Sequence, residues 1–311
     1  METKKILASD IINEFNLKII NKEIDLNREI TQPSISRLGL ELTDAIDHKH
    51  IKGRLVGWGT KENKYFKRIG EEKTLIILGK LFSHEIPLLI LSQGIEDDVA
   101  KIIIQAATKT KTPVCKNNSE RLASITTTIG NMLITHFAEW EKVHGSLIII
   151  NGMGVLIVGK SGVGKSEAIL DLLQRGHSFV SDDSTIIKKI GNYFVGQASK
   201  ITKGLLEARG IGLIDIPQIY GVSIVRDQSD IDIVIELVLQ ENGVEFDRLG
   251  NKFLKYEILG SNIPKIQIPV NHGKSIASLI ETATSVFMAE KVGINGLKKF
   301  QENITSESED N

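Results

Sequence analysis

Residues 155–173 read VLIVGKSGVGKSEAILDLL and carry the clearest structural signal in the chain. The apolar run at 155–158 predicts a buried strand, and an amphipathic helical pattern follows the glycines. The residues between them fit G-x-x-x-x-G-K-[ST], a pattern expected by chance only about 0.02 times in a chain of this size. They are Gly159, Lys160, Ser161, Gly162, Val163, Gly164, Lys165 and Ser166. We therefore predict a phosphate-binding loop between a strand and a helix.

The residue types in this loop explain how it would hold a nucleotide. Its glycines let the backbone wrap closely, with N–H groups pointing inward, and the helix start adds partial positive charge. Lys165 is predicted to reach the β- and γ-phosphates, and the Ser166 hydroxyl to hold Mg²⁺. The alternative is a glycine-rich turn between strand and helix that binds no ligand.

Two carboxylates follow the next apolar segment, in HSFVSDD at 177–183. In a phosphate-binding fold such a strand lies beside the loop, which would place Asp182 and Asp183 near the γ-phosphate. One can face Mg²⁺ while the other accepts a proton from an attacking hydroxyl. Neighbouring residues of a strand point to opposite faces, so both share the site only if the strand has ended. The alternative is two solvated loop aspartates.

The class of nucleotide-binding protein follows from the motifs that the sequence lacks. No Asn-Lys-x-Asp motif for reading guanine is present, nor a helicase or transporter-ATPase motif set. These residues are compatible with a kinase and do not name its acceptor.

The bulk composition fits one large or two ordinary domains. The chain has 311 residues, 41% hydrophobic, and a formal charge of −1, which implies no strong attraction to nucleic acid or anionic membrane. Cys115 is the single cysteine, so disulfides are excluded, and we favour a small buried hydrophobe over a reactive thiol. No signal peptide or run of about 18 apolar residues occurs, so a cytoplasmic protein is predicted.

The pattern along the chain predicts an N-terminal α/β domain at 1–135, a phosphate-binding domain at 136–305 and a disordered tail at 306–311. Hydrophobic periodicity gives the expected elements. The predicted helices are 7–20, 96–108, 119–140, 167–176 and 275–293. The predicted strands are 74–82, 86–92, 112–118, 146–150, 153–159, segments around a turn at 191–192, and 230–239.

Five motifs in order over 143–250 closely resemble the HPr kinase/phosphorylase family. They read VHGSL, GKSGVGKSE, RGHSFVSDD, LLEARGIGLIDI and FDRLG. The resemblance implies Mg²⁺- and ATP-dependent phosphorylation of a regulatory serine of the phosphocarrier HPr, which controls carbon metabolism. It also implies the reverse reaction, in which inorganic phosphate attacks phosphoserine and releases pyrophosphate, and assembly as a homohexamer.

The same resemblance assigns roles to individual residues. His144 would lie near the transferred phosphate. Asp183 would be the base in the forward direction and the acid in reverse, with Asp182 beside it. Glu207 would be the second protein ligand of Mg²⁺, and Arg248 would stabilise charge on the moving phosphoryl group.

Each assignment also has a structural alternative. His144 could simply be a histidine at the start of a strand, and Arg248 a turn residue. Glu207 and Arg209 could form a surface ion pair.

One segment departs from the family pattern. After PKIQIPV the family shows Lys-x-Gly-Arg, associated with the phosphorylase direction, whereas this chain has NHGK at 271–274. Lys274 keeps a positive charge but cannot make a planar bidentate contact. The balance between the two directions therefore does not follow from the resemblance.

Two other functions remain as alternatives from the residues alone. A kinase of a small molecule would use the same loop and label a metabolite. A nucleotide-sensing binding module would hydrolyse little, and its partner binding would survive loss of the Asp183 carboxylate.

Overall fold

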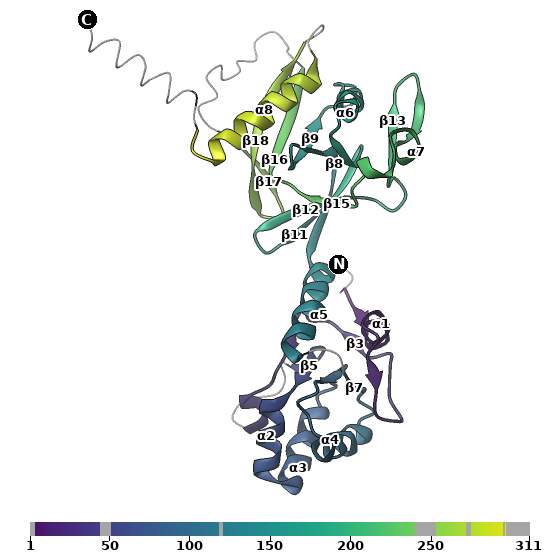
Figure 1. Ribbon diagram of the computed structural model, residues 1–311, viewed down its shortest axis with the longest axis vertical. Coiled ribbons are helices and arrows are strands. Elements are labelled where there is room, and N and C mark those ends of the chain that lie inside the picture. The colour runs from purple at the N-terminus through teal and green to yellow at the C-terminus, as the bar shows by residue number, and fades with distance from the viewer. Residues whose placement is uncertain are drawn as a thin grey trace, which may run out of the picture. The chain divides into compact units, whose positions relative to one another are not determined.

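The computed structural model describes residues 4–43, 51–117, 121–239, 253–271, 275–294 and 296. The chain divides into two compact units, Met1–Ala138 and Glu139–Asn311 (Figure 1). Arg248, Lys274 and the tail at 306–311 lie outside the described residues. No helix within the described ranges is long and apolar enough to cross a membrane.

The first unit is built on a five-stranded sheet. Its order is β2 (Lys18–Ile19), β7 (Val114–Lys116), β6 (Leu89–Leu91), β5 (Leu55–Trp58) and β4 (Ile35–Ser36). Strands β4 to β7 are parallel, and β2 is antiparallel at the edge. A separate ribbon pairs β1 (Ile6–Leu7) with β3 (Glu29–Ile30). Because parallel neighbours need crossover connections, helices separate β5, β6 and β7 along the chain.

The helices of this unit form a separate core on each face of the sheet. They are α1 (Ala8–Glu14), η1 (Leu40–Thr43), α2 (Thr60–Ile69), α3 (Glu71–Phe82), α4 (Asp97–Lys109) and α5 (Leu122–Phe137). Trp58 and Leu89 pack into the core shared with α2, α3 and α4. Leu55 and Ile90 lie on the opposite face of the sheet and pack with α1 and α5. The alternation of side chains along each strand thus fills both cores.

One predicted strand is a helix. Segment 74–82 forms most of α3, with Thr74, Leu78, Leu81 and Phe82 buried at helical spacing. Ile76 is 56% exposed, although a strand would place it on the same face as Thr74 and Leu78. The prediction was wrong because a nearly continuous apolar run hides its period, which the burial pattern then reveals.

The predicted helix at 7–20 is half as long as expected. Helix α1 ends at Glu14, and Asn16 takes the left-handed conformation with φ of 47°. Asparagine tolerates that region, so the chain turns there. Ile19, which the helical pattern included, belongs to strand β2.

Other predicted elements of this unit are confirmed in type, although the helix predicted at 119–140 is shorter, because Glu139 and Trp140 begin strand β8 (Glu139–Ile150). Strand β6 lies inside 86–92, helix α4 matches 96–108, and α5 lies inside 119–140. Cys115 is fully buried in β7, and this burial raises the pKa of its thiol to about 12. The thiol therefore packs as an apolar group and carries almost no thiolate at neutral pH.

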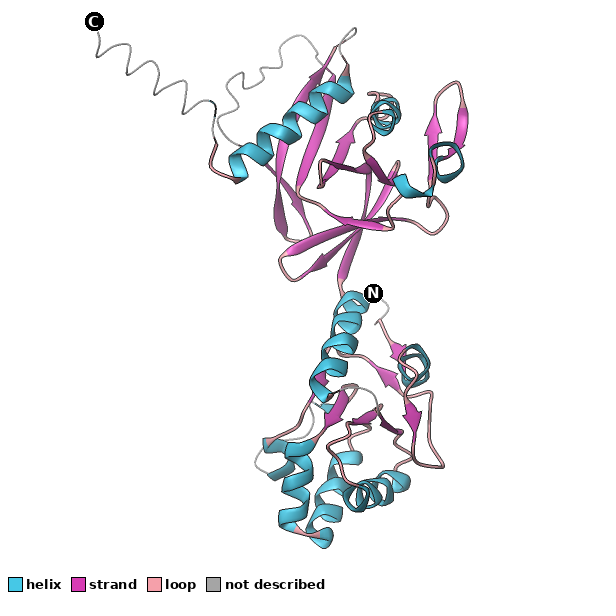
Figure 2. Cartoon of the chain, in the orientation of Figure 1, coloured by secondary structure: helices cyan, strands magenta, loops and turns pink. Residues whose placement is uncertain are grey.

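The second unit is built on a nine-stranded sheet, and Figure 2 shows how strands predominate there. The order is β15 (Gln228–Asp230), β12 (Tyr193–Ala198), β11 (Ser184–Ile190), β8 (Glu139–Ile150), β9 (Met153–Gly159), β16 (Ile233–Leu239), β18 (Ser261–Val270) and β17 (Leu254–Ile258). Strand β10 (Ser178–Ser181) lies off this path and pairs with β8. Strands β9, β16 and β18 are parallel. The strands predicted at 153–159 and 230–239 are thereby confirmed.

A two-residue turn joins β8 to β9, as the Asn-Gly pair predicts. Asn151 and Gly152 have φ of 51° and 85°, the positive values that a type I′ hairpin turn requires. The strand that precedes the phosphate-binding loop is therefore held in register by the hairpin.

Helices α6 (Lys165–Gln174) and α8 (Ile276–Lys291) pack on one face of this sheet, in the core that contains Ile157 and Ile235. A hairpin, β13 (Leu205–Ala208) and β14 (Gly212–Asp215), precedes the short elements α7 (Ile216–Tyr220) and η3 (Val222–Ile224). Glu281 of α8 accepts hydrogen bonds from His177 and Arg175, which hold the pKa of that carboxyl below its usual value. These contacts join α8 to the C-terminal end of α6, the helix that begins at Lys165.

Candidate functional site

The predicted phosphate-binding loop, residues 159–166, runs from the end of β9 into the first turn of α6. A Cβ at Gly159 would lie 2.6 Å from the carbonyl oxygen of Leu237, so that position needs a glycine. Gly164 has φ of 100°, and a Cβ there would lie 2.8 Å from Ile276 Cδ1. The glycines thus let the loop pass close to β16 and α8 and turn directly into the helix.

Lys165 is held against the loop that it follows. Its side chain is mostly buried, and Nζ donates to the carbonyl oxygens of Gly159 at 2.9 Å and Lys160 at 3.4 Å. The same ammonium lies 3.4 Å from His144 Nε2. A cation in this position, at the positive end of α6, is suited to an anionic ligand.

Asp182 is a buried carboxylate with three protein donors. Ser146 Oγ donates to Oδ1 at 2.6 Å, and the amide of Glu207 donates to Oδ2 at 3.3 Å. Ser166 Oγ also donates to Oδ2, at 3.3 Å. The hydroxyl and the carboxylate predicted to serve the metal therefore lie in direct contact, and the hard oxygen atoms of this pair suit Mg²⁺.

Both aspartates follow strand β10, which ends at Ser181, so strand alternation does not force Asp182 and Asp183 to opposite faces. Asp183 takes a left-handed backbone conformation, with φ of 57°, and its Oδ1 lies 3.0 Å from His144 Nδ1. The side chain is 70% exposed, so it is accessible to a substrate hydroxyl.

His144 connects the carboxylate to the lysine. Because the ammonium of Lys165 can only donate, His144 Nε2 is the acceptor, and Nδ1 carries the proton that it donates to Asp183. The hydrogen-bond network thus places the ring proton on Nδ1. One imidazole links the group that would bind phosphate to the group that would accept a proton.

The path by which the carboxylates reach the loop differs from the prediction. Strand β10 does not adjoin β9, because β8 lies between them. The β8–β10 pairing shifts register between Phe179 and Ser181. Such an irregularity re-aims the end of a strand, and here it precedes the two aspartates.

Glu207 and Arg209 belong to the β13–β14 hairpin region. The Glu207 amide touches Asp182, which brings this residue to the site, and its side chain is exposed. A Cβ on Gly162 would lie 3.4 Å from Arg209 Nη2, so the guanidinium lies over the phosphate-binding loop. These two described residues form no ion pair with each other, which excludes the surface-pair alternative.

The structure therefore brings together residues from four segments distant in sequence. They are His144, Lys165, Ser166, Asp182, Asp183, Glu207 and Arg209. Among the described residues, no three His, Cys, Asp or Glu side chains form a metal-binding group by themselves.

Sequence reasoning missed Ser146. It is fully buried in β8 and makes the shortest hydrogen bond to Asp182. Its signal was a single hydroxyl at the start of the apolar run SLIII at 146–150. A buried polar group needs a partner, and that partner is the carboxylate of another strand.

Comparison with known proteins identifies relatives over nearly the whole chain. The model described as HPr Serine kinase N terminus matches residues 6–133, and that described as HPr Serine kinase C-terminal domain matches 135–304. The HPr kinase/phosphorylase of Mycoplasmopsis pulmonis is 45% identical over 96% of this chain and 97% of its own length. That of Bacillus subtilis is 34% identical, over 98% of each.

A solved structure titled Structure of the Hpr(Ser) kinase/phosphatase from Coxiella burnetii also matches. It is 34% identical, covers 52% of this chain and 99% of that chain, and has a TM-score of 0.47.

Proposed function

The chain belongs to the HPr kinase/phosphorylase family, and from this premise we propose how its residues carry out the reaction. The protein is a kinase/phosphorylase that phosphorylates and dephosphorylates HPr, with a regulatory role in carbon metabolism. ATP is the proposed donor, and a serine hydroxyl of HPr the proposed acceptor. The observation that carries the residue assignment is the continuous contact from Asp183 through His144 to Lys165.

In the forward direction the serine oxygen attacks the γ-phosphorus of ATP, and the bond from that phosphorus to the β–γ bridging oxygen breaks. Asp183 accepts the serine proton, and ADP leaves. His144 orients the carboxylate through Nδ1–H. Lys165 binds the β- and γ-phosphates, so most of the rate enhancement comes from positioning and electrostatics.

In the reverse direction an oxygen of inorganic phosphate attacks the phosphorus of phosphoserine. The bond to the serine oxygen breaks, pyrophosphate forms, and Asp183 returns the proton to the serine. One carboxylate therefore serves both directions, as microscopic reversibility requires. The phosphate-binding loop would hold inorganic phosphate where it otherwise holds the β-phosphate of the nucleotide.

Asp182 and Ser166 are the proposed holders of Mg²⁺, with Glu207 beside them. When bound, the ion would neutralise charge on the phosphates. The protein's own residues keep the hydroxyl of Ser166 in contact with the carboxylate of Asp182. The hydrogen bond that Ser146 donates to this carboxylate helps to hold it in place.

Phosphate transfer tests the whole proposal. Purified protein is mixed with Mg²⁺, γ-labelled ATP and HPr, and excess inorganic phosphate is added later. We expect label on a serine of HPr, then its loss together with the appearance of pyrophosphate. Label that persists would reject the reverse reaction and direct attention to 271–274. No label on HPr, with nucleotide binding intact, would reject HPr as the acceptor.

Ser146→Ala is expected to weaken the metal site without abolishing transfer. Loss of a buried hydrogen bond to a carboxylate costs about 1.5–3 kcal/mol. We therefore expect the Mg²⁺ concentration for half-maximal transfer to rise about tenfold or more. Ser184→Ala is the matched control, since its buried hydroxyl has no partner among the described residues. Equal Mg²⁺ concentrations for half-maximal transfer in the two variants would contradict a role for Ser146 in the metal site.

Assembly as a homohexamer and a cytoplasmic location stay predictions. The native mass of the particle in solution and cell fractionation, respectively, would check them.

A further inference from the structure

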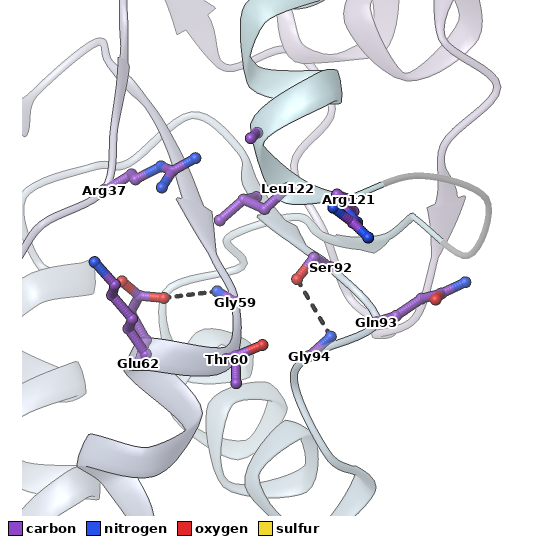
Figure 3. A pocket seen from close by; sticks show the side chains of 11 residues that line it. Arg37, Gly59, Thr60, Glu62, Ser92, Gln93, Gly94, Arg121 and Leu122 are labelled. Atoms are coloured by element: carbon purple, nitrogen blue, oxygen red, sulfur yellow. Dashed lines mark hydrogen bonds between the residues drawn. The ribbon is translucent and has the colours of Figure 1, made fainter.

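The first unit contains a cavity to which sequence analysis gave no role. It has a volume of about 360 Å³ and lies where β5 and β6 end. Gly59 and Thr60 lead from β5 into α2, and Ser92 and Gly94 follow β6 (Figure 3). In open sheets with parallel strands, ligands bind outside the carboxyl ends of the strands. We call this cavity the basic pocket.

Two glycines bring the walls of the basic pocket together. A Cβ on Gly94 would lie 2.2 Å from Thr60 Oγ1 and 2.7 Å from the Thr60 amide nitrogen. A Cβ on Gly59 would lie 2.9 Å from Ser92 Oγ. The loops after β5 and β6 therefore touch along their backbones, and their polar groups line one continuous surface.

The charge of the lining is mostly positive. Arg37 follows β4, Lys61 is in the first turn of α2, and Arg121 precedes α5. Figure 3 shows Arg37 and Arg121 on either side of Leu122. Glu62 is the one acidic side chain of the lining, and it accepts a hydrogen bond from the Gly59 amide at 2.7 Å.

Among the described residues, the guanidinium groups of Arg37 and Arg121 have no anionic partner. Neither side chain forms an ion pair or a hydrogen bond there. Both side chains are exposed, and they come from segments more than 80 positions apart that the sheet places around one opening. Arginine presents a planar fork of N–H donors that matches the oxygens of a phosphate.

Further donors face the same space. Within the described ranges, the amides of Thr60 and Lys61, in the first turn of the ten-residue helix α2, have no acceptor. The Ser92 side chain, 5% exposed, accepts a bond from the Gly94 amide, and its own proton has no acceptor among the described residues. Amides at a helix start, a buried hydroxyl and two arginine forks form a set of donors for an anion.

We propose that the basic pocket binds a small phosphate monoester. The phosphate would lie between the two arginines, at the start of α2. The pocket exceeds the size of a phosphate group and falls in the range of small-molecule sites, about 300–1,000 Å³, so it also holds an organic part. Leu122 offers an apolar contact for that part. This site lies in the first unit and is independent of the proposed phosphoryl transfer.

Hydrogen exchange of the full-length protein tests this site without interference from the phosphate-binding loop. Glycerol 3-phosphate is the probe, and mass spectrometry follows peptides that cover 58–66 and 90–96 separately from those that cover 155–170. We expect concentration-dependent protection of the first two regions. Arg37→Ala and Arg121→Ala should each raise the concentration for half-maximal protection about tenfold, since each removes a charge-assisted contact.

Matched controls make the outcome decisive. Arg68 is an exposed arginine of helix α2 that stacks on Tyr65, and it does not line the basic pocket. The Arg68→Ala variant should therefore leave protection unchanged. Glycerol, which lacks the phosphate, should protect neither region. Protection confined to 155–170, equal protection by glycerol or by acetate, or protection insensitive to both pocket arginines would overturn the proposal. None of these results bears on transfer to HPr.

Discussion

Asp183→Asn is expected to reduce phosphorylation of the HPr serine by about 10²–10⁴-fold, the usual contribution of a general base. The amide cannot accept the serine proton. Its Oδ1 can still accept the hydrogen bond from His144 Nδ1. Asparagine also tolerates the left-handed backbone at this position, where φ is 57°. The fold and nucleotide affinity should therefore survive, and the loss should fall on kcat.

The measurement is single-turnover transfer of γ-labelled phosphate to HPr, with nucleotide affinity determined in parallel. Asp98→Asn, an exposed aspartate of the first unit that pairs with Lys67, is the matched control and should transfer normally. The same Asp183 variant should also lose the phosphate-dependent reverse reaction, since one carboxylate serves both. Near-normal transfer in either direction would show that Asp183 is not the base for that direction.

Lys165→Met is expected to lower transfer by about 10²–10³-fold or more, because it removes a preorganised charge from the phosphates. Methionine fills the partly buried space that the lysine stem occupies. The carbonyls of Gly159 and Lys160 lose a donor, and water can replace it because neither residue is buried. The unfolding temperature should change little while nucleotide affinity falls.

Lys160→Met provides the comparison for that substitution. It changes the same residue type within the same loop, but its side chain is exposed. Transfer assays and nucleotide titrations on both variants separate the function of Lys165 from a general loss of positive charge. A Lys165 variant that transfers as well as the Lys160 variant would contradict the assigned role.

The strand, glycine-rich turn and helix of the predicted phosphate-binding loop could be predicted from neighbouring residues alone. Its signal is local: a strand pattern, glycines at fixed spacing and a helix pattern lie within nineteen consecutive residues, 155–173. The turn at Asn151–Gly152 was equally predictable, because both positions need positive φ and these residue types supply it. The five motifs over 143–250 also identified the family, which the comparisons confirm.

Features that depend on contacts between distant segments of the chain could be seen only in the tertiary structure. The run at 74–82 has too few polar residues to show its period, so only packing against the sheet reveals a helix. Ser146 supports Asp182 because β8 lies between β9 and β10, a strand order that no local pattern contains. The basic pocket likewise forms from the ends of parallel strands, which gather Arg37 and Arg121 from distant segments. Local backbone preferences depend on neighbouring residues. Burial and sheet register depend instead on contacts that form only when the whole unit packs.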